Sequence, residues 1–340
     1  MVRFGIVGFG LHAEKRMMPA FAQSQKCKVT ALSRRTMEKA QRSSRQWNIP
    51  LGFDSVEKLA GSPEVDAVFV TTPNNVHLPD VLAVVAAGKP VLCEKPLAMN
   101  ASECLQMVEA ARKTKVLFGV AHVFRFEESV LRLRERVATG EIGKPLFARS
   151  EFHFFADSSH PRLWLHDMKV AGGGPIADIG VHCIDSLRFV LQDEVVRVSA
   201  RGAHDELSGK MEAAAALTLE FSRGTLATVL VSYRAEYRTP FEVIGPTGVL
   251  SGEHFLNVEQ PIALELRRGG QIVRSETVSN NLAYTRMLDA FAEAMENKTD
   301  YSIPGEEGWQ NQEVLDAAYR SMKSGNAEDV TRVSHVQSVR

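Results

Sequence analysis

The sequence has little cysteine, no long apolar run and no excess of charge of either sign. Its 340 residues include four cysteines, too few for a disulfide framework and never in the C-x-x-C spacing of a zinc site. Forty Lys and Arg face 41 Asp and Glu, a balance unlike that of a protein whose main partner is nucleic acid. The apolar runs fall far short of the roughly 20 residues that span a bilayer. We therefore expect no membrane span, no metal site and no nucleic-acid partner.

The beginning of the chain predicts a location. The apolar residues 1–10 lead directly into charged residues, and no small-residue cleavage site of a signal peptide follows. Scattered cysteines are typical of a reducing compartment. We expect a cytoplasmic protein, and the length predicts two domains.

Residues 1–122 alternate short apolar strands with helical patterns. Continuously apolar strands separated by helices are typical of a parallel sheet covered on both faces. We predict a doubly wound α/β domain here. The expected strands are 2–7, 28–32, 67–71, 90–93 and 116–121, and the expected helices are 11–23, 37–47, 77–87 and 100–113.

Residues 123–340 have a different pattern, in which strand follows strand at hairpin spacing. This pattern predicts an α+β domain on a large, mostly antiparallel sheet. The polar tail after Asn326 is expected to be loose. The expected strands are 146–155, 195–201, 213–221, 224–232, 241–244, 263–267 and 272–276, and the expected helices are 127–138, 284–295 and 306–322.

A glycine-rich turn after the first strand is predicted to bind a dinucleotide. In a G-x-G-x-x-A pattern, Gly8 permits a tight turn, Gly10 lets the backbone approach a pyrophosphate, and Ala13 lets helix and strand pack closely. The start of the helix then presents N–H groups to the phosphates. A purely structural turn is the alternative. The predicted contacts are Gly8, Phe9, Gly10, Leu11 and His12.

The end of the second strand predicts the cofactor. An NAD site carries an acidic residue about 20 residues beyond the turn, but this sequence has Ser33, Arg34 and Arg35 there. A hydroxyl with a guanidinium suits a 2′-phosphate. A solvated basic turn is the alternative. We predict NADP, with NAD possible.

Two further turns follow parallel strands at their carboxyl ends, where open α/β sheets bind ligands. Both turns are predicted to contact the cofactor, and Lys95 is predicted to contact the substrate as well. A lysine in an ordinary surface turn is the alternative. The first turn contains Thr71, Thr72, Pro73 and Asn74 with His77 nearby, and the second contains Glu94 and Lys95 before Pro96.

A third motif, glycines 172–174 followed by Asp178 and His182, predicts acid–base chemistry. Residues four apart on a helix share one face. Histidine carries protons near neutral pH, and a carboxylate can orient the substrate or tune the base. Asp178 as a helix N-cap and His182 as a packed core residue are the alternatives.

Taken in order, these motifs resemble the Gfo/Idh/MocA oxidoreductases over nearly the whole chain. The resemblance rests on GFGLHA, TTPNNVH, AGKPVLCEKPLA and AGGGPIADIGVHCIDSLRFV. It implies an N-terminal Rossmann domain and a C-terminal open sheet that often makes subunit contacts, hence a homodimer or homotetramer. It also implies that Lys95 assists hydride transfer, while Asp178 and His182 bind substrate hydroxyls and exchange a proton.

Within the family, the Ser33-Arg34-Arg35 run resembles NADP-using members, and the segment from His160 to the glycines resembles sugar-acting members. Arg125 and Trp164 are accordingly expected to contact substrate, although Leu165 stands where such relatives commonly have arginine. The resemblance implies an NADP-dependent oxidoreductase that interconverts CH–OH and C=O on a sugar, polyol or related carbonyl compound. Redox-assisted glycoside hydrolysis with a tightly bound cofactor, or a non-catalytic NADP sensor, is the alternative.

Overall fold

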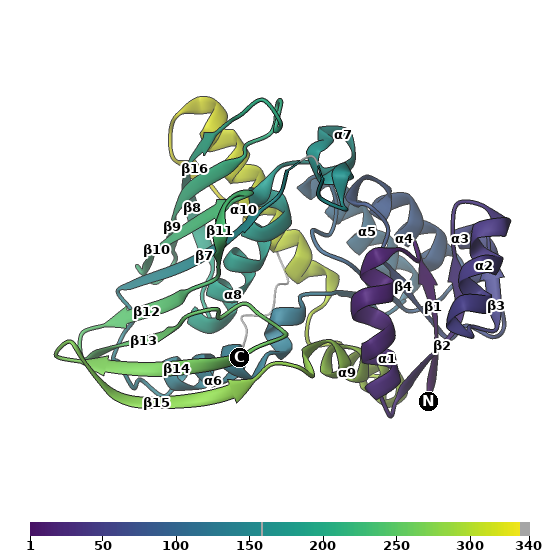
Figure 1. The fold of residues 1–340 in the computed structure, drawn as a ribbon, viewed down its shortest axis with the longest axis horizontal. Helices are drawn as coiled ribbons and strands as arrows, with labels where there is room; N and C mark the ends of the chain where they lie inside the picture. The colour runs from purple at the N-terminus through teal and green to yellow at the C-terminus, as the bar shows by residue number, and fades with distance from the viewer. Residues whose placement is uncertain (158, 334–340) are drawn as a thin grey trace. The chain divides into compact units, whose positions relative to one another are not determined.

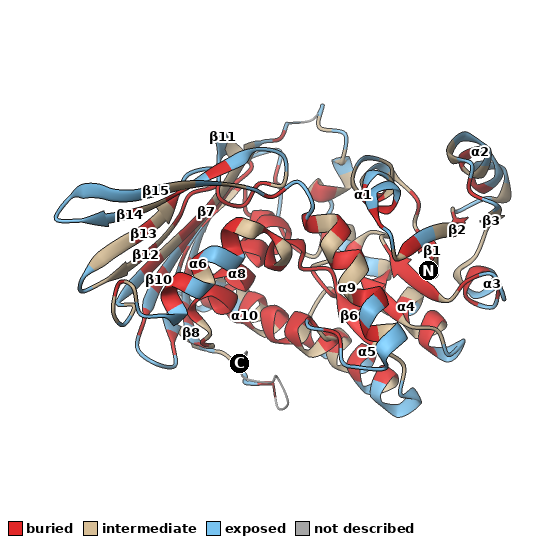
Figure 2. Cartoon of the chain, turned by 90° about the horizontal axis from the view of Figure 1, so that it is seen from below, coloured by how far each residue is buried: buried red, intermediate tan, exposed pale blue. Residues whose placement is uncertain are grey.

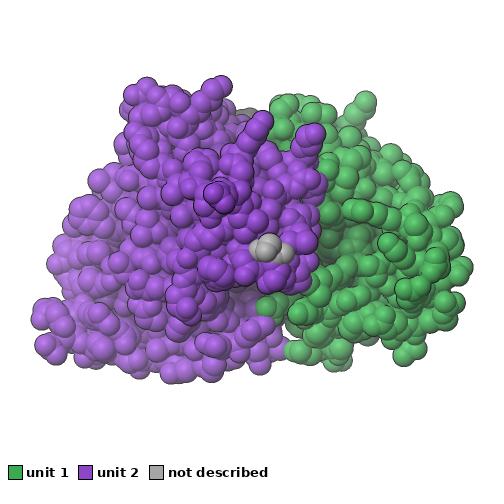
Figure 3. Space-filling view, turned by 45° about the horizontal axis from the view of Figure 1, so that its top comes forward, with its two compact units in different colours: residues 1–122, 284–309 green, residues 123–283, 310–340 purple. Residues whose placement is uncertain are grey.

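The computed structural model describes residues 1–157 and 159–333, which form two compact units (Figures 1 and 3). Unit 1 comprises Met1–His122 and Tyr284–Trp309, and unit 2 comprises Val123–Ala283 and the residues from Gln310 on. The division at 122 and 123 coincides with the expected boundary. Residues 284–309, expected in the second domain, are instead part of unit 1.

The reason is that helix α9 (Ala283–Asn297) covers the unit 1 sheet. Its Phe291 ring lies 6.1 Å from the ring of Phe4 in β1, and its Asp289 accepts a hydrogen bond from the Ser24 hydroxyl. An apolar helix face must be buried against some element, and sequence pattern alone does not say which one.

Unit 1 is built on six parallel strands in the order β3-β2-β1-β4-β5-β6. Both faces are covered: Phe4 packs on Phe21 of α1 and on α9, whereas Gly5 faces Leu59 of α3. The strands are β1 Val2–Val7, β2 Cys27–Ser33, β3 Leu51–Phe53, β4 Ala67–Val70, β5 Val91–Cys93 and β6 Phe118–Val120. The helices are η1 Ala13–Met17, α1 Met18–Gln23, α2 Met37–Trp47, α3 Val56–Ala60, η2 Asn74–Val76, α4 His77–Ala86, α5 Ala101–Thr114 and α9.

Unit 2 is built on a ten-stranded sheet in the order β15-β14-β13-β12-β7-β10-β9-β8-β16, with β11 paired to β7. Only the β7–β10 pairing is parallel among its described strands. The strands are β7 Phe147–Phe155, β8 Val195–Ala203, β9 Ala214–Phe221, β10 Leu226–Ser232, β11 Arg234–Arg238, β12 Phe241–Gly245, β13 Gly248–Gly252, β14 Pro261–Arg268, β15 Gln271–Ser279 and β16 Glu328–Asp329. The helices are η3 Val123–Phe126, α6 Glu128–Ala138, η4 Leu163–His166, α7 Met168–Ala171, η5 Ile176–Gly180, α8 Val181–Leu191 and α10 Gly305–Ser324, of which residues 305–309 belong to unit 1.

One face of the unit 2 sheet carries the core. Along β9, Leu217 and Leu219 are buried while Ala216 and Thr218 are exposed, as period-two alternation requires. Helix α8 is buried on all sides, and Figure 2 shows it with α6 and α10 beside the sheet. The two predicted fold classes are therefore confirmed.

Four short strands were not expected from the sequence: β3, β11, β13 and β16. The last corrects the expectation of a loose tail for residues 328–333, because Glu328 pairs with Val198 of β8 and the Val333 N–H bonds Gln310. The tail beyond residue 333 lies outside the described residues. In the described part of the chain, no helix is long and apolar enough to cross a membrane.

Candidate active site

The predicted cofactor turns meet at one edge of the unit 1 sheet. The strand order reverses direction between β1 and β4, and such a switch point is where open α/β sheets bind ligands. Gly8 follows β1 and Thr71 follows β4. The Thr71 hydroxyl donates to the carbonyl oxygens of Val7 at 3.0 Å and Gly8 at 3.1 Å, so the two turns are tied together.

The two glycines of the turn serve different purposes. Gly8 has φ +80°, and a Cβ there would lie 2.8 Å from the backbone of Thr72, so this chain itself requires glycine. At Gly10 a Cβ would meet only the Gly8 carbonyl, at 3.6 Å, which is ordinary contact. Nothing among residues 1–157 and 159–333 requires glycine at position 10. A ligand whose phosphates approach this backbone accounts for it, so the turn fits a dinucleotide.

This difference yields a prediction for two matched variants. We expect Gly8→Ala to lower the free energy of unfolding by about 1–3 kcal/mol, because alanine is strained there and collides with Thr72. Gly10→Ala should leave the unfolding curve within about 0.5 kcal/mol of wild type but weaken NADPH binding. Urea denaturation and fluorescence titration with NADPH measure the two quantities. A Gly10→Ala protein that binds NADPH as wild type does would show that the turn is only structural.

The side chain of Arg34 is oriented by the protein and open to a ligand. Its Nη1 donates to the Ser43 hydroxyl at 2.8 Å and lies 3.9 Å from Glu14, while the whole side chain is 32% exposed. Among residues 1–157 and 159–333, the opposite edge of the guanidinium, Nε with Nη2, has no protein partner. That edge can bind a phosphate in bidentate geometry. Ser33 is buried and Arg35 is exposed.

Two histidines hold the turn that carries Lys95. His77 is fully buried; its Nε2 lies 2.8 Å from the Thr72 carbonyl oxygen and its Nδ1 lies 3.1 Å from that of Pro96. Burial lowers the pKa of His77. The His77 ring thus lies between the turn after β4 and the turn after β5 and contacts both. This geometry supports a positioning role in place of the expected cofactor contact.

His12 makes the second connection, between the glycine-rich turn and the turn after β5. Its Nε2 lies 2.9 Å from Glu94 Oε1, and Glu94 Oε2 accepts a hydrogen bond from the Lys95 N–H at 3.2 Å. Burial by itself raises the pKa of Glu94, but His12 and Lys95 outweigh burial and hold this pKa below its ordinary value. The carboxylate is therefore ionised, and it fixes the backbone of Lys95.

The other expected cofactor residues differ in exposure. Phe9 is buried with its ring 6.1 Å from that of Trp47, Asn74 is buried, and Leu11 is 39% exposed. Thr72 donates a hydrogen bond to Asp80 at 2.7 Å, and Pro73 is half-buried. Phe9 and Asn74 thus contribute to the packing of the turns.

In unit 2, Asp178 and His182 lie on one continuous helical run. Asp178 belongs to η5, which is a π-helix, and His182 to the first turn of α8. Single π-turns inside α-helices are frequent at functional sites. Asp178 is 7% exposed and His182 is 8% exposed. Asp178 is not an N-cap, because the run begins before it at Ile176.

The three glycines before this run allow it to pack closely. Gly172 ends α7 with φ +79°. A side chain at Gly173 would overlap the Tyr319 phenol, and one at Gly174 would overlap the Glu212 backbone. Glu212 in turn accepts hydrogen bonds from the Ile176 N–H at 2.9 Å and the Tyr319 hydroxyl at 3.1 Å. The glycine motif therefore lets the N-terminus of the helical run pack closely against the buried Glu212 side chain.

His182 lies against aromatic rings. Its imidazole centroid is 4.5 Å from the ring of Phe124 and 6.2 Å from the ring of Phe152. Of the other expected substrate contacts, Trp164 is half-buried in η4, whereas Leu165 is 1% exposed. Leu165 therefore packs in the core of unit 2.

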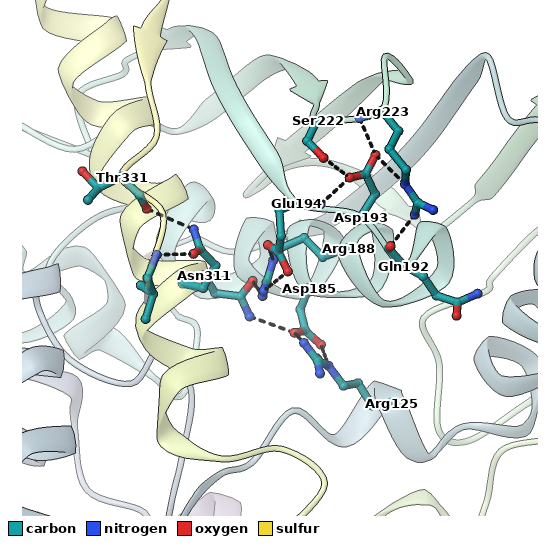
Figure 4. A network of polar contacts seen from close by, with 12 residues as sticks. Arg125, Asp185, Arg188, Gln192, Asp193, Glu194, Ser222, Arg223, Asn311 and Thr331 are labelled. Carbon is teal, nitrogen blue, oxygen red and sulfur yellow. Dashed lines mark hydrogen bonds and ion pairs between the residues drawn. The ribbon is translucent and has the colours of Figure 1, made fainter. Parts of the chain in front are cut away.

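Arg125, the remaining expected substrate contact, is part of a buried polar network (Figure 4). Its Nε and Nη2 donate to Asp185 at 2.7–3.0 Å, and both side chains are almost fully buried. Asn311 connects this pair to Arg188, which in turn pairs with Glu194. Figure 4 shows the Arg125 guanidinium directed at Asp185 on α8. We therefore interpret Arg125 as a structural residue that supports the helix carrying His182.

Sequence reasoning missed several residues of this region. Tyr233, Arg162 and Glu212 all contact the segment around Asp178. Tyr233 is 55 residues from Asp178 and belongs to no motif, so no local signal could have identified it. No group of three or more His, Cys, Asp or Glu side chains that could hold a metal occurs within residues 1–157 and 159–333.

Known proteins resemble this chain over its whole length. Residues 2–122 match the oxidoreductase family with an NAD-binding Rossmann fold, and residues 130–251 match the GFO/IDH/MocA C-terminal domain. The 1,5-anhydro-D-fructose reductase of Ensifer adhaerens is 32% identical over 97% of this chain and 99% of its own length. The D-xylose 1-dehydrogenase (NADP(+)) 2 of Haloferax volcanii is 28% identical over 96% and 99%.

A solved structure has the same fold as this chain. The crystal structure of the aldose-aldose oxidoreductase from Caulobacter crescentus, complexed with glycerol, superposes with a TM-score of 0.90 at 26% identity, covering 97% of this chain and 99% of that one. The matched family domains, the full-length relative and the strand order of unit 1 all confirm the resemblance found in the motifs. The chain belongs to the Gfo/Idh/MocA family of oxidoreductases.

Proposed function

We propose that this protein is an NADP(H)-dependent oxidoreductase that interconverts CH–OH and C=O on a sugar, a polyol or a related carbonyl compound. The observation that carries the proposal is the coupling of three turns at the switch point of the unit 1 sheet. His12 and His77 tie the turn of Lys95 to the glycine-rich turn and to the turn after β4. A lysine in an ordinary surface turn would not need such support.

The residues of unit 1 fit a dinucleotide phosphate ester. Gly10 leaves room for phosphates, and Arg34 offers one free guanidinium edge beside the buried Ser33. Glycine-rich turns at helix N-termini bind phosphate through free N–H groups. Bound NADP would supply the hydride acceptor or donor of the reaction. These observations support NADP over NAD, because only NADP carries a 2′-phosphate for Arg34.

The chain itself would supply proton transfer and substrate orientation. We assign Lys95 Nζ and the His182 imidazole to proton exchange with the reacting hydroxyl, since ammonium and imidazole groups are suited to that task. We assign the Asp178 carboxylate to hydrogen bonds with substrate hydroxyls. The aromatic rings of Phe124 and Phe152 limit the orientations open to His182. Trp164, which is half-buried, is the proposed apolar contact for a sugar ring.

The names of the relatives support the substrate class. The Ensifer and Haloferax proteins are named for a reductase of an anhydro-sugar and a dehydrogenase of a pentose, and the second name specifies NADP(+). The Caulobacter structure contains glycerol, a small polyol. These similarities do not distinguish one sugar from another, and we propose the class only.

The test is an absorbance assay at the NADPH band over a panel of aldoses, anhydro-sugars, osones and diols. We expect net NADPH consumption or formation with at least one member. Glycoside cleavage without net turnover would instead favour redox-assisted hydrolysis. Tight NADPH binding with neither reaction across the panel would favour a sensor and would contradict the proposal.

Cofactor preference is tested at Arg34. Arg34→Ala should weaken NADPH binding by about 10- to 150-fold, which corresponds to the roughly 1.5–3 kcal/mol of a hydrogen bond to a charged group. NADH binding should change far less, because NADH lacks the 2′-phosphate. Arg42→Ala is the control and should leave NADPH binding unchanged, because Arg42 is exposed and pairs with Glu38 on α2. Equal losses for both cofactors would show that Arg34 acts only by packing, and a wild-type preference for NADH would overturn the assignment.

We also propose that the protein forms a homodimer or homotetramer whose interface is the exposed face of the unit 2 sheet. Phe147 and Leu226 are directly opposite each other on β7 and β10, and they are 52% and 43% exposed. Monomers rarely leave contiguous apolar patches uncovered. Light scattering at micromolar concentration should give a dimer or tetramer, and Phe147→Asp should shift it toward monomer. A wild-type monomer would contradict this proposal.

A further inference from the structure

The carboxylate of Asp178 contacts side chains from outside the helical run that carries it, among them Tyr233 and Arg162. The Tyr233 hydroxyl donates to Oδ2 at 3.1 Å, and Arg162 Nη1 lies 3.8 Å from Oδ1. Tyr233 is 2% exposed, whereas the Arg162 side chain is 38% exposed. One oxygen of the carboxylate is therefore held by a buried group, and the other is paired with a group that remains in contact with solvent.

The Tyr233 phenol is itself immobilised by its surroundings. The backbone N–H of Tyr233 donates to the Ala213 carbonyl at 2.9 Å, and the backbone carbonyl of Tyr233 accepts from the Ala156 N–H at 2.9 Å. Its ring packs on Phe154, with centroids 5.0 Å apart, and on His166 at 6.2 Å. Burial raises the pKa of Tyr233 well above its ordinary value, so the phenol keeps its proton and acts as a donor at neutral pH.

A carboxylate that binds a polyol must present its lone pairs in a fixed direction. Rotation about the terminal torsion of an aspartate is soft, so the direction is set by hydrogen bonds to one of the oxygens. Here the hydroxyl of Tyr233 holds Oδ2. Oδ1 lies 3.8 Å from Nη1 of Arg162, whose side chain is 38% exposed. Group orientation of this kind is a large part of enzymatic acceleration.

We propose that Tyr233 is a positioning residue for Asp178, fixing Oδ2 so that Oδ1 accepts the hydrogen bond of a substrate hydroxyl. This inference rests on the proposed function, which assigns Asp178 to substrate binding. It adds a residue from the bend between β10 and β11 to a site whose expected members came from helices and turns. Because Tyr233 acts through Asp178, replacing Tyr233 should change KM more than kcat.

The experiment compares Tyr233→Phe with wild type, using whichever panel compound turns over best. We expect KM to rise about 10- to 100-fold, the loss typical of a hydrogen bond to a charged group, with kcat changed less than threefold. Tyr301→Phe in unit 1 is the matched control, since Tyr301 is also 2% exposed; its KM should stay within twofold of wild type. A KM for Tyr233→Phe within twofold of wild type overturns the inference.

A double-mutant cycle separates positioning from mere packing. In the Asp178→Asn background, the further change Tyr233→Phe should alter KM less than threefold, because the negatively charged acceptor is already gone. Equal effects of Tyr233→Phe on KM in both backgrounds would mean that Tyr233 acts independently of Asp178, which overturns the inference. A lower kcat with unchanged KM would indicate a loss of folded enzyme and would overturn it too.

Failure of the proposed function can be distinguished from failure of the inference about Tyr233. If wild type turns over no compound of the panel, the proposed function fails, and binding of the same polyols is then measured by calorimetry. Weaker binding to Tyr233→Phe than to wild type and Tyr301→Phe would support the inference without catalysis. Equal binding to all three proteins, or binding to none, would overturn it.

Discussion

Replacing Lys95 by alanine is expected to reduce turnover by about 10²- to 10⁴-fold, the usual contribution of a positioned acid–base group. NADPH binding should remain largely intact. The reason is that the turn is held by its backbone and neighbours: His77 contacts the Pro96 carbonyl, and Glu94 accepts the Lys95 N–H. These contacts do not require the ammonium group. Steady-state kinetics and fluorescence titration with NADPH measure the two effects on the same protein.

His182→Asn should give a turnover loss of the same order and should also flatten one limb of the pH–rate profile, because asparagine cannot exchange a proton near neutral pH. Asparagine is smaller than histidine, so the variant loses part of the packing against Phe124 and Phe152. The melting temperature of the variant therefore needs to be recorded beside its kinetics.

The control for Lys95 is Lys113→Ala, at the exposed end of α5, which should leave kcat and KM unchanged. Two results would contradict the assigned role. Turnover of Lys95→Ala within threefold of wild type would remove Lys95 from the chemistry. Loss of NADPH binding equal to the loss of turnover would make Lys95 a cofactor-binding residue only.

Asp185→Ala is expected to destabilise the protein by about 3–5 kcal/mol, the typical effect of removing one partner of a buried ion pair. Asp185 is 1% exposed and accepts hydrogen bonds from both Arg125 and Asn311. Without the carboxylate, the buried Arg125 guanidinium loses its ion-pair partner. Urea denaturation followed by circular dichroism measures the change.

Arg132→Ala provides the control, because Arg132 pairs with Glu128 on the surface of α6 with 51% of its side chain exposed. Exposed pairs contribute about 0–1 kcal/mol. A destabilisation below 1 kcal/mol for Asp185→Ala would show that the Arg125 pair is unimportant to folding. In that case the expected role of Arg125 in substrate binding would regain support.

Much of the architecture could be predicted because it depends on local patterns. Continuously apolar strands such as Ala67–Val70 alternate with amphipathic helices, and this periodicity indicates a parallel sheet without knowledge of any contact. Gly8 is likewise recognisable from its place between strand and helix. Short strands such as β3 and β13 were missed, because their pairing depends on neighbours more than on their own residues.

The motifs also marked candidate ligand contacts without revealing what each residue does. His77 and Arg125 both appeared as ligand contacts in the sequence. In the structure His77 is fully buried beneath two turns, and Arg125 is held by Asp185. Burial depends on what the rest of the chain places around a side chain, so a motif can mark a residue as important without separating contact from support.

The sequence by itself determined the fold class, which follows from periodicity, and the positions of Lys95, Asp178 and His182 within their motifs. The family followed from the resemblance of those motifs to known proteins. Only the tertiary structure decided that α9 belongs to unit 1 and that Tyr233 holds Asp178 from 55 residues away. The physical reason is that hydrogen bonding and packing act between neighbours in space. Residues far apart in the chain become neighbours only when the two sheets and their helices have formed.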